Sequence, residues 1–143
     1  LVDPEYTYGY IQSTFTLYFP DPRYYNETAS TATVGSGATA ITNNGWAYTC
    51  PTITIASPSS SFTITYYVSG TSTGTMGFSN VNTGASMTID LLQRTIVQGI
   101  AATPSRNTFT SGDWISIQPY ALGATTLSLS SGSMSVTWRD AYI

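Results

Sequence analysis

The chain has 143 residues and a net charge of −3, with seven acidic residues, four arginines, one cysteine and no histidine or lysine. Without histidine and lysine, the chain cannot form a Ser-His-Asp or Cys-His catalytic site, a Schiff base or the phosphate-binding lysine of a P-loop. Four arginines make no basic face for nucleic acid, one cysteine makes no internal disulfide or zinc cage, and no apolar run approaches the roughly 18 residues of a membrane span.

Small hydroxyl side chains dominate the composition, with 25 Thr and 19 Ser, while 41% of the residues are hydrophobic and 13% are aromatic. Disordered chains are poor in aromatic and β-branched residues, so we expect this chain to fold. A weakly charged, Thr-rich surface is common on secreted and particle-borne proteins. The chain begins at Leu1 rather than Met, as after removal of a signal peptide or in a fragment of a longer chain. We therefore expect an extracellular, cell-surface or virion-surface location.

Apolar and polar residues alternate along much of the chain, which is the pattern of strands with one buried face. In chain order, the alternating segments are residues 11–19, 53–55, 62–68, 87–91, 115–117, 127–129 and 134–138. The turn signals between them include Pro20-Asp21-Pro22, Asn43-Asn44-Gly45, residues 57–61, Ser111-Gly112-Asp113 and Ser131-Gly132. This spacing predicts an all-β fold, a single-domain jelly-roll-like β-sandwich over residues 1–143 with about eight or nine strands and almost no helix.

Two segments leave alternatives open. Residues 29–40 are rich in Ser, Thr, Ala and Gly, which suits a long loop or an edge strand better than a domain linker. Residues 90–98 have some helical spacing, but the β-branched run Thr95-Ile96-Val97 favours a strand. We expect a strand or a single turn there.

Few residues qualify for catalysis, metal binding or modification. No two carboxylates have a spacing that pairs them across a cleft, as a glycosidase requires, and Asp3, Glu5 and Asp21 lack the spacing of a calcium loop. Cys50 has no histidine to activate it and is expected to behave as a small apolar residue. Asn26 begins an Asn-Glu-Thr sequon and is a candidate glycosylation site. We predict no enzyme activity, no metal and no cofactor.

Tyrosines crowd the start of the chain, at Tyr6, Tyr8, Tyr10, Tyr18, Tyr24 and Tyr25. Tyrosine is enriched at subunit interfaces, and its ring can also stack on the face of a sugar. Strands favour it in ordinary cores as well. A subunit interface, core filling and a sugar-binding platform are therefore the three interpretations of this cluster.

The last third of the chain combines a Gly-Asp turn leading into one strand, a short Thr/Leu strand and a terminal strand that ends on an aromatic residue. These features lie at residues 109–117, 125–129 and 132–138. The pattern resembles the end of the jelly-roll heads of phage and viral fibres. That resemblance covers about 30 residues and implies a jelly roll in an assembled particle, without catalytic residues. The chain departs from those heads because no shaft-like sequence precedes Leu1.

Residues 5–19 form a long alternating segment with almost no charge. This arrangement resembles secreted β-sandwich subunits of extracellular filaments, such as TasA-like fibres and archaeal bundling pili. In such fibres the terminal strand of one subunit completes the sheet of its neighbour. Residues 1–19 are then the donated strand, with interface residues Tyr6, Tyr8, Tyr10, Ile11, Phe15, Leu17 and Phe19. The alternative is that this strand pairs within its own sheet.

The sequence thus predicts a non-enzymatic structural subunit of an extracellular filament or pilus, which polymerises with copies of itself by β-strand complementation. The alternative is a receptor-binding head or coat protein of a virus or phage, such as a homotrimer, that engages cell-surface carbohydrate. In both cases we expect no nucleic-acid partner and no membrane span.

Overall fold

The structure, a computed structural model, describes residues 23–69 and 71–143. In this part the chain forms thirteen β-strands and two short 3-10 helices, η1 (Arg106–Thr108) and η2 (Tyr120–Leu122). The predicted all-β sandwich class is confirmed, although the strands outnumber the eight or nine that the sequence indicated. Three of the thirteen have only two residues, which is too short to show an alternating pattern. The predicted strand at 11–19 lies outside the described residues.

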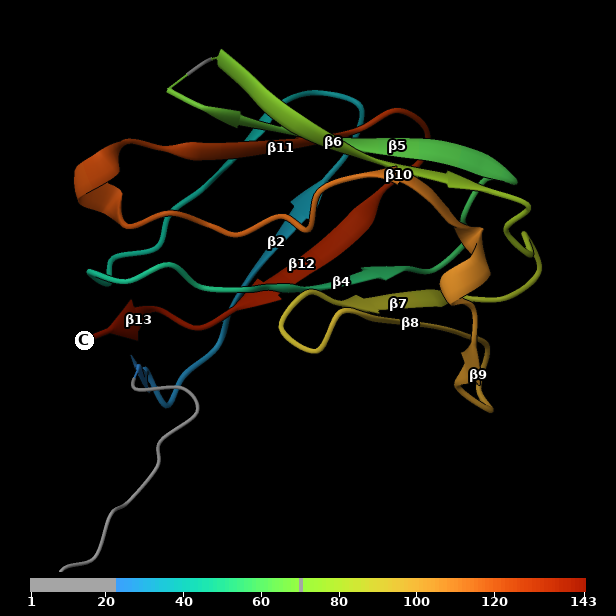
Figure 1. The fold of residues 1–143 in the computed structure, drawn as a ribbon, viewed down its shortest axis with the longest axis horizontal. Helices are drawn as coiled ribbons and strands as arrows, with labels where there is room; N and C mark the ends of the chain where they lie inside the picture. Colours follow the sequence, from blue (N-terminus) through green and yellow to red (C-terminus); the bar gives the residue numbers. More distant parts are fainter. Residues whose placement is uncertain (1–22, 70) are drawn as a thin grey trace, which may run out of the picture.

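Two antiparallel sheets face each other and form the two layers of the sandwich (Figure 1). The five-stranded sheet has the order β10 (Phe109–Gly112), β6 (Thr71–Ser79), β5 (Ser61–Val68), β11 (Thr125–Leu129) and β3 (Thr39–Ile41). The six-stranded sheet has the order β2 (Ser30–Val34), β12 (Met134–Trp138), β4 (Thr52–Ile55), β7 (Met87–Asp90), β8 (Thr95–Gln98) and β9 (Thr103–Pro104). A third, two-stranded sheet pairs β1 (Tyr24–Tyr25) with β13 (Ala141–Tyr142).

The core lies between the two large sheets and follows directly from the alternation in the sequence. In β5 the apolar side chains of Phe62 and Ile64 point inward and are buried. The ring of Phe62 stacks on that of Phe78 in β6, with 4.7 Å between centroids. From the facing sheet, Ile53 and Ile89 are fully buried in the same cluster. Burial of these side chains is the main force that holds the layers together.

The outer face of the six-stranded sheet carries the hydroxyl side chains that alternate with the core residues. Thr137 in β12 lies opposite Thr31 in β2 on one side and Thr52 in β4 on the other. The hydroxyls of Thr31 and Thr137 are 3.3 Å apart, within hydrogen-bond distance. The Thr-rich composition therefore covers this sheet with uncharged polar groups.

The structure decides between the alternatives that the sequence left open for residues 29–40 and 90–98. Residues 29–40 contain two edge strands, since β2 ends the six-stranded sheet and β3 ends the five-stranded one. Residues 90–98 contain a tight turn followed by the strand β8. The turn is held by the Asp90 carboxylate, which accepts a hydrogen bond from the Gln93 N–H at 2.9 Å, and Arg94 completes it with a φ of 56°.

One expectation from the sequence is wrong. Residues 115–117 form no regular strand, because their only ladder contact is a single bridge between Ile117 and Thr49. Ile115 and Ile117 are nevertheless fully buried, so burial produced the alternation without a strand. The Asn43-Asn44-Gly45 turn signal corresponds to a bend at Gly45 and Trp46, where the Asn43 Oδ1 accepts a hydrogen bond from the Gly45 N–H at 3.0 Å. Residues 43–49, which follow β3, then pair with segments that are distant in sequence.

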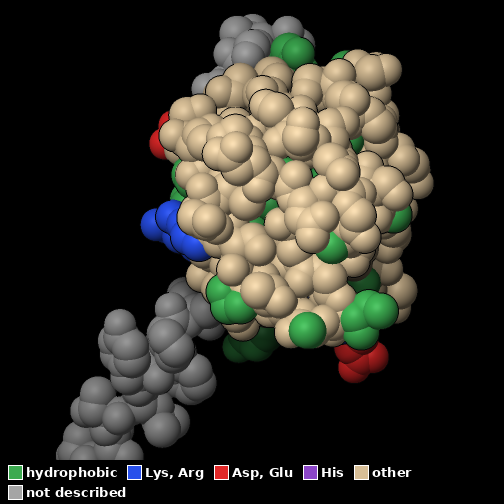
Figure 2. Space-filling view, turned by 90° about the vertical axis from the view of Figure 1, so that its right-hand side faces the viewer, with side chains coloured by type: hydrophobic (Ala, Val, Ile, Leu, Met, Phe, Trp, Pro, Cys, Tyr) green, Lys and Arg blue, Asp and Glu red, His purple; other side chains and the backbone are tan. Residues whose placement is uncertain are grey.

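The surface differs between the two ends of the sandwich. Figure 2 shows the right-hand end of Figure 1, where most of the surface is uncharged and polar and hydrophobic side chains are scattered singly. The strand β9 and the helix η1 lie toward this end (Figure 1). Among the described residues, no helix is long and apolar enough to cross a membrane.

Candidate interaction surface

Four short segments lie side by side at the left-hand end of the sandwich in Figure 1, and we call them the end strip: β1, β13, residues 43–49 and residues 115–118. β1 pairs with β13, and the Ala47 N–H donates to the Ala141 carbonyl at 2.9 Å. Thr49 and Ile117 then exchange two backbone hydrogen bonds of 2.9 and 2.8 Å. The end strip therefore joins segments from the start, middle and end of the described chain.

Residues 43–49 alternate strictly between buried and exposed positions. The inward positions hold Asn43, Gly45, Ala47 and Thr49, which are all buried. Gly45 is required there because a Cβ at this position would overlap the backbone carbonyl of Ala141. Small inward residues let the segment lie directly against β13, and the large side chains must then point outward.

The Asn43 side chain holds the strip together from inside. Its Nδ2 donates to the Ala47 carbonyl at 2.7 Å, and its Oδ1 accepts from the N–H groups of Gly45 at 3.0 Å and Ala141 at 3.3 Å. Asn43 is buried, with only 1% of its surface exposed. Its side chain pairs backbone groups that would otherwise need the ladder hydrogen bonds that the strip lacks at this point. The neighbouring carboxylate of Asp140 accepts from the backbone and side-chain N–H groups of Asn44 at 3.1 and 3.2 Å.

Large aromatic side chains project outward from this strip and the adjoining helix η2. Trp46 is 81% exposed, Tyr24 74%, Tyr120 69% and Tyr48 48%. We call the set Tyr24, Trp46, Tyr48, Tyr120 and Tyr142 the aromatic end. Because apolar groups of this size are normally buried, their exposure together at one end makes this set the candidate interaction surface.

The register of the strands places three of these rings in one row. Tyr24 lies directly opposite Tyr142 in the β1–β13 pair. Ala47 forms an antiparallel bridge with Ala141. Trp46, one position before Ala47, therefore lies beside Tyr142, on the side of β13 opposite to Tyr24. The backbone N–H of Tyr120 donates to the Asn43 carbonyl at 3.0 Å and holds η2 against the strip.

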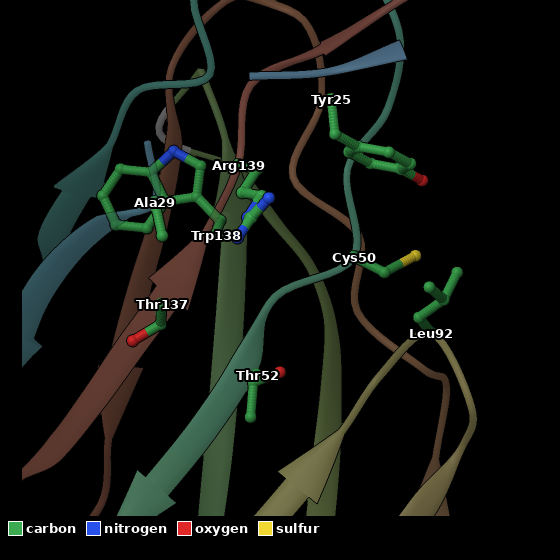
Figure 3. A pocket seen from close by; sticks show the side chains of 8 residues that line it. All are labelled: Tyr25, Ala29, Cys50, Thr52, Leu92, Thr137, Trp138 and Arg139. Carbon is green, nitrogen blue, oxygen red and sulfur yellow. The ribbon is translucent and has the colours of Figure 1, made fainter. Parts of the chain in front are cut away.

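An open pocket of about 290 Å³ lies beside the end strip, on the six-stranded sheet. Figure 3 shows its lining side chains: Tyr25, Ala29, Cys50, Thr52, Leu92, Thr137, Trp138 and Arg139. They come from β1, the segments that precede β2 and β4, the first residue of β4, the turn after β7, the end of β12 and the residue that follows it. Cys50 is half-buried, in contact with the core on one side and with this pocket on the other.

The residues predicted from the sequence are only partly placed. The seven predicted interface residues between positions 6 and 19 lie outside the described residues, and that prediction stays untested. Of the N-terminal tyrosines that are described, Tyr24 is exposed and Tyr25 is half-buried at the pocket. Asn26 is exposed together with Glu27 and Thr28, while its backbone N–H donates to the Asp140 carbonyl at 2.9 Å. A glycan at Asn26 stays a prediction.

The sequence did not single out Trp46, Tyr48 or Tyr120. A signal was present, because residues 43–49 alternate small and large side chains in the same period-two pattern as the predicted strands. The turn propensity of Asn43-Asn44-Gly45 concealed it. No group of three or more His, Cys, Asp or Glu residues in the described ranges could hold a metal ion.

No protein-family model matches the chain, and no curated protein sequence matches it. Among solved structures, the chain is similar to the Dit protein of phage SPP1, described as a paradigm of the hub adsorption apparatus in phages that infect Gram-positive bacteria. The two share 16% sequence identity at a TM-score of 0.74, over 87% of this chain and 50% of that one. The chain thus spans about half the length of the Dit protein, and the likeness shows a shared fold.

Proposed function

We propose that the chain is a non-enzymatic structural module of a virus or phage particle, carried on the outside of the virion as part of its adsorption apparatus. The observation that supports this function is the structural likeness to the phage hub protein, which extends over 87% of the chain. Proteins with the same fold can differ in function, so the described surface must supply the second argument.

That surface is the aromatic end. A ring face carries negative charge density and attracts the C–H bonds that line one side of a pyranose, while the tyrosine hydroxyls can bind the sugar hydroxyls. Neighbouring side chains also offer hydrogen bonds, since Asn44 is exposed between the buried Asn43 and Gly45. The aromatic end therefore suits cell-surface carbohydrate as the ligand of the adsorption module.

The size of the surface favours a small ligand over another protein. Aromatic side chains present about 150–250 Å² each, so the exposed fractions of Trp46, Tyr24, Tyr120 and Tyr48 amount to roughly 400–700 Å². A stable protein interface needs about 800 Å² from each partner. These four rings alone present less than that area, which suits a ligand of a few sugar rings.

Binding to an array of bacterial and archaeal surface glycans tests this function. The intact chain is expected to bind a defined set of glycans, and Trp46→Ala should weaken that binding at least tenfold because Trp46 is the most exposed ring. Leu122→Ala is the matched control, since Leu122 is 55% exposed at the same end and has no ring. Equal binding by Trp46→Ala and the intact chain, or no glycan bound at all, would argue against the aromatic end as the adsorption surface.

A second candidate function is a subunit of an extracellular filament or pilus that polymerises through the donated strand 1–19. The observation that favours it is the edge position of β2 and β3, because edge strands can accept a strand from another chain. Deletion of residues 1–19 should then abolish polymerisation and leave a soluble, destabilised body. A polymer that persists after this deletion would rule out strand donation.

A further inference from the structure

The two large sheets end at four edge strands, and three of these edges are protected against pairing with another chain. β9 has two residues, one of which is Pro104, and β3 has only three residues. The pairing of β10 with β6 shifts its register between Phe109 and Ser111, and β10 ends at Gly112 with a φ of 101°. Short length, proline and bulges are among the features by which natural sheets block their edges.

The fourth edge strand, β2, has none of these features. Its five residues pair with β12 in one unbroken register and include no proline and no charged side chain. Among the described residues, no strand lies on the other side of β2. Along the chain, the charged residue before β2 is Glu27, and the next one after it is Asp90. Within the described ranges, β2 is therefore the edge that is open to another strand.

The sequence of β2, Ser30-Thr31-Ala32-Thr33-Val34, is suited to pairing with itself. When two copies run antiparallel about Ala32, all five residues of each strand are paired. Thr31 and Thr33 are exposed on the outer face, and this register places them opposite each other. Cross-strand threonine pairs stabilise sheets. A shift by one position would bring buried side chains of one strand opposite exposed side chains of the other.

This pairing would produce a closed dimer. Both copies contribute the same strand, so the contact is isologous and leaves no open β2 edge from which a polymer could grow. The two six-stranded sheets would become one continuous sheet. Residues 28–89, which include β2, contain no charged residue, so this part of the chain brings no like charges together at the contact.

We propose that β2 pairs antiparallel with β2 of a second copy of this chain, in the register that places Thr31 opposite Thr33. This pairing goes beyond the proposed adsorption function, because it concerns how copies of the module are joined. It also differs from strand donation in a filament, since both copies contribute the same edge and residues 1–19 take no part in the contact.

Disulfide cross-linking between two variants tests both the contact and its register. Thr31→Cys and Thr33→Cys are made separately in a Cys50→Ser background, with an affinity tag on one of them. In the proposed register the two cysteines lie directly opposite each other, within disulfide reach. Two copies of the same variant place their cysteines diagonally, about 7–8 Å apart and at or beyond that reach. Under oxidised glutathione, the mixture should form the mixed dimer at least tenfold faster than either variant alone forms its own dimer.

The control for random collision is Thr54→Cys in the same background. Thr54 is exposed on the same outer face but lies in β4, inside the sheet. Mixed dimers that form no faster than the Thr54→Cys dimer would overturn the proposal. Faster linkage within one variant than between the two would show another register and would overturn it as well. Failure to bind glycans in the array experiment leaves this result unaffected.

A second measurement needs no oxidation and compares Thr33→Lys with Thr54→Lys. Thr33 and Thr54 lie on either side of Ser135 in β12, and both are exposed, so both variants should fold. A lysine on an edge strand blocks pairing with another strand. In analytical ultracentrifugation, Thr33→Lys is expected to weaken dimerisation at least tenfold and Thr54→Lys less than twofold. Equal effects of the two substitutions, or an intact chain that stays monomeric at every concentration, would contradict pairing through β2.

Discussion

The two ends of the sandwich treat aromatic side chains in opposite ways. At the end that carries η1, Phe109 and Trp114 stack on each other with 5.2 Å between centroids, and Arg106 covers both rings at 5.2 and 4.4 Å. Both rings also pack against the core. At the aromatic end, Trp46 and Tyr24 are mostly exposed and do not belong to the core cluster. The difference indicates that the first cluster stabilises the fold and the second is available for binding.

The cause of this difference lies in the residues on the inner side. At the aromatic end the inward positions are taken by Gly45, Ala47 and Ala141, which leave no room for a ring. At the other end the core reaches Phe109 through Phe78, at 5.7 Å between ring centroids. Three predictions test this contrast between the two ends.

The largest effect is expected from Asn43→Ala, because the substitution removes the side chain that holds the end strip together. It leaves the Ala47 carbonyl and the N–H groups of Gly45 and Ala141 without their partners. Each buried unsatisfied group costs about 1–3 kcal/mol, so we expect the free energy of unfolding to fall by about 3–5 kcal/mol. Urea denaturation followed by circular dichroism measures this change. Asn107→Ala, at an exposed position in η1, is the control and should change stability by less than about 0.5 kcal/mol.

The contrast between the ends can be measured directly with two tryptophans. Trp114→Ala removes a ring packed against the core and should cost about 3 kcal/mol of unfolding free energy. Trp46→Ala removes a ring that is 81% exposed and should change it by less than about 0.5 kcal/mol. Thermal and chemical denaturation of both variants gives the comparison. Similar losses of unfolding free energy from the two substitutions would mean that Trp46 stabilises the fold and is not available to bind a ligand.

A smaller effect is expected from Gly45→Ala, since a Cβ at this position would overlap the Ala141 carbonyl and push residues 43–49 away from β13. Crowding of this kind costs about 2 kcal/mol. At Gly37 a Cβ would meet no heavy atom within 4 Å, so Gly37→Ala should be neutral or slightly stabilising. If the two glycine variants unfold at the same denaturant concentration, close packing of the strip against β13 is not what orients the aromatic end.

The sequence predicted the strands that are long enough for apolar and polar residues to alternate visibly within the strand itself. Phe62, Ile64 and Tyr66 alternate over a full strand, and β5 lies where that pattern indicated. Residues 115–117 have the same pattern without a strand, because Ile115 and Ile117 are buried in the core while the segment makes only a single bridge to Thr49. Strands of two residues, such as β1 and β13, have no period to detect.

The aromatic end could not be predicted from the sequence for a different reason. Tyr24, Trp46 and Tyr142 are far apart along the chain and are brought together only by pairings with β13. Even the correct strand assignment would not have placed Trp46 next to Tyr142, because a single bridge fixes that register. The predicted interface at residues 6–19 lies outside the described residues and remains a prediction.

Negative-stain electron microscopy of the native assembly tests the central proposal most directly, because it distinguishes a virion component from a filament subunit. The proposed adsorption function predicts discrete particles or closed rings, with this chain located by a specific antibody at the part that contacts the host. Long unbranched fibres composed of this chain would contradict it. They would show a contact between subunits that does not close and would establish the filament function in its place.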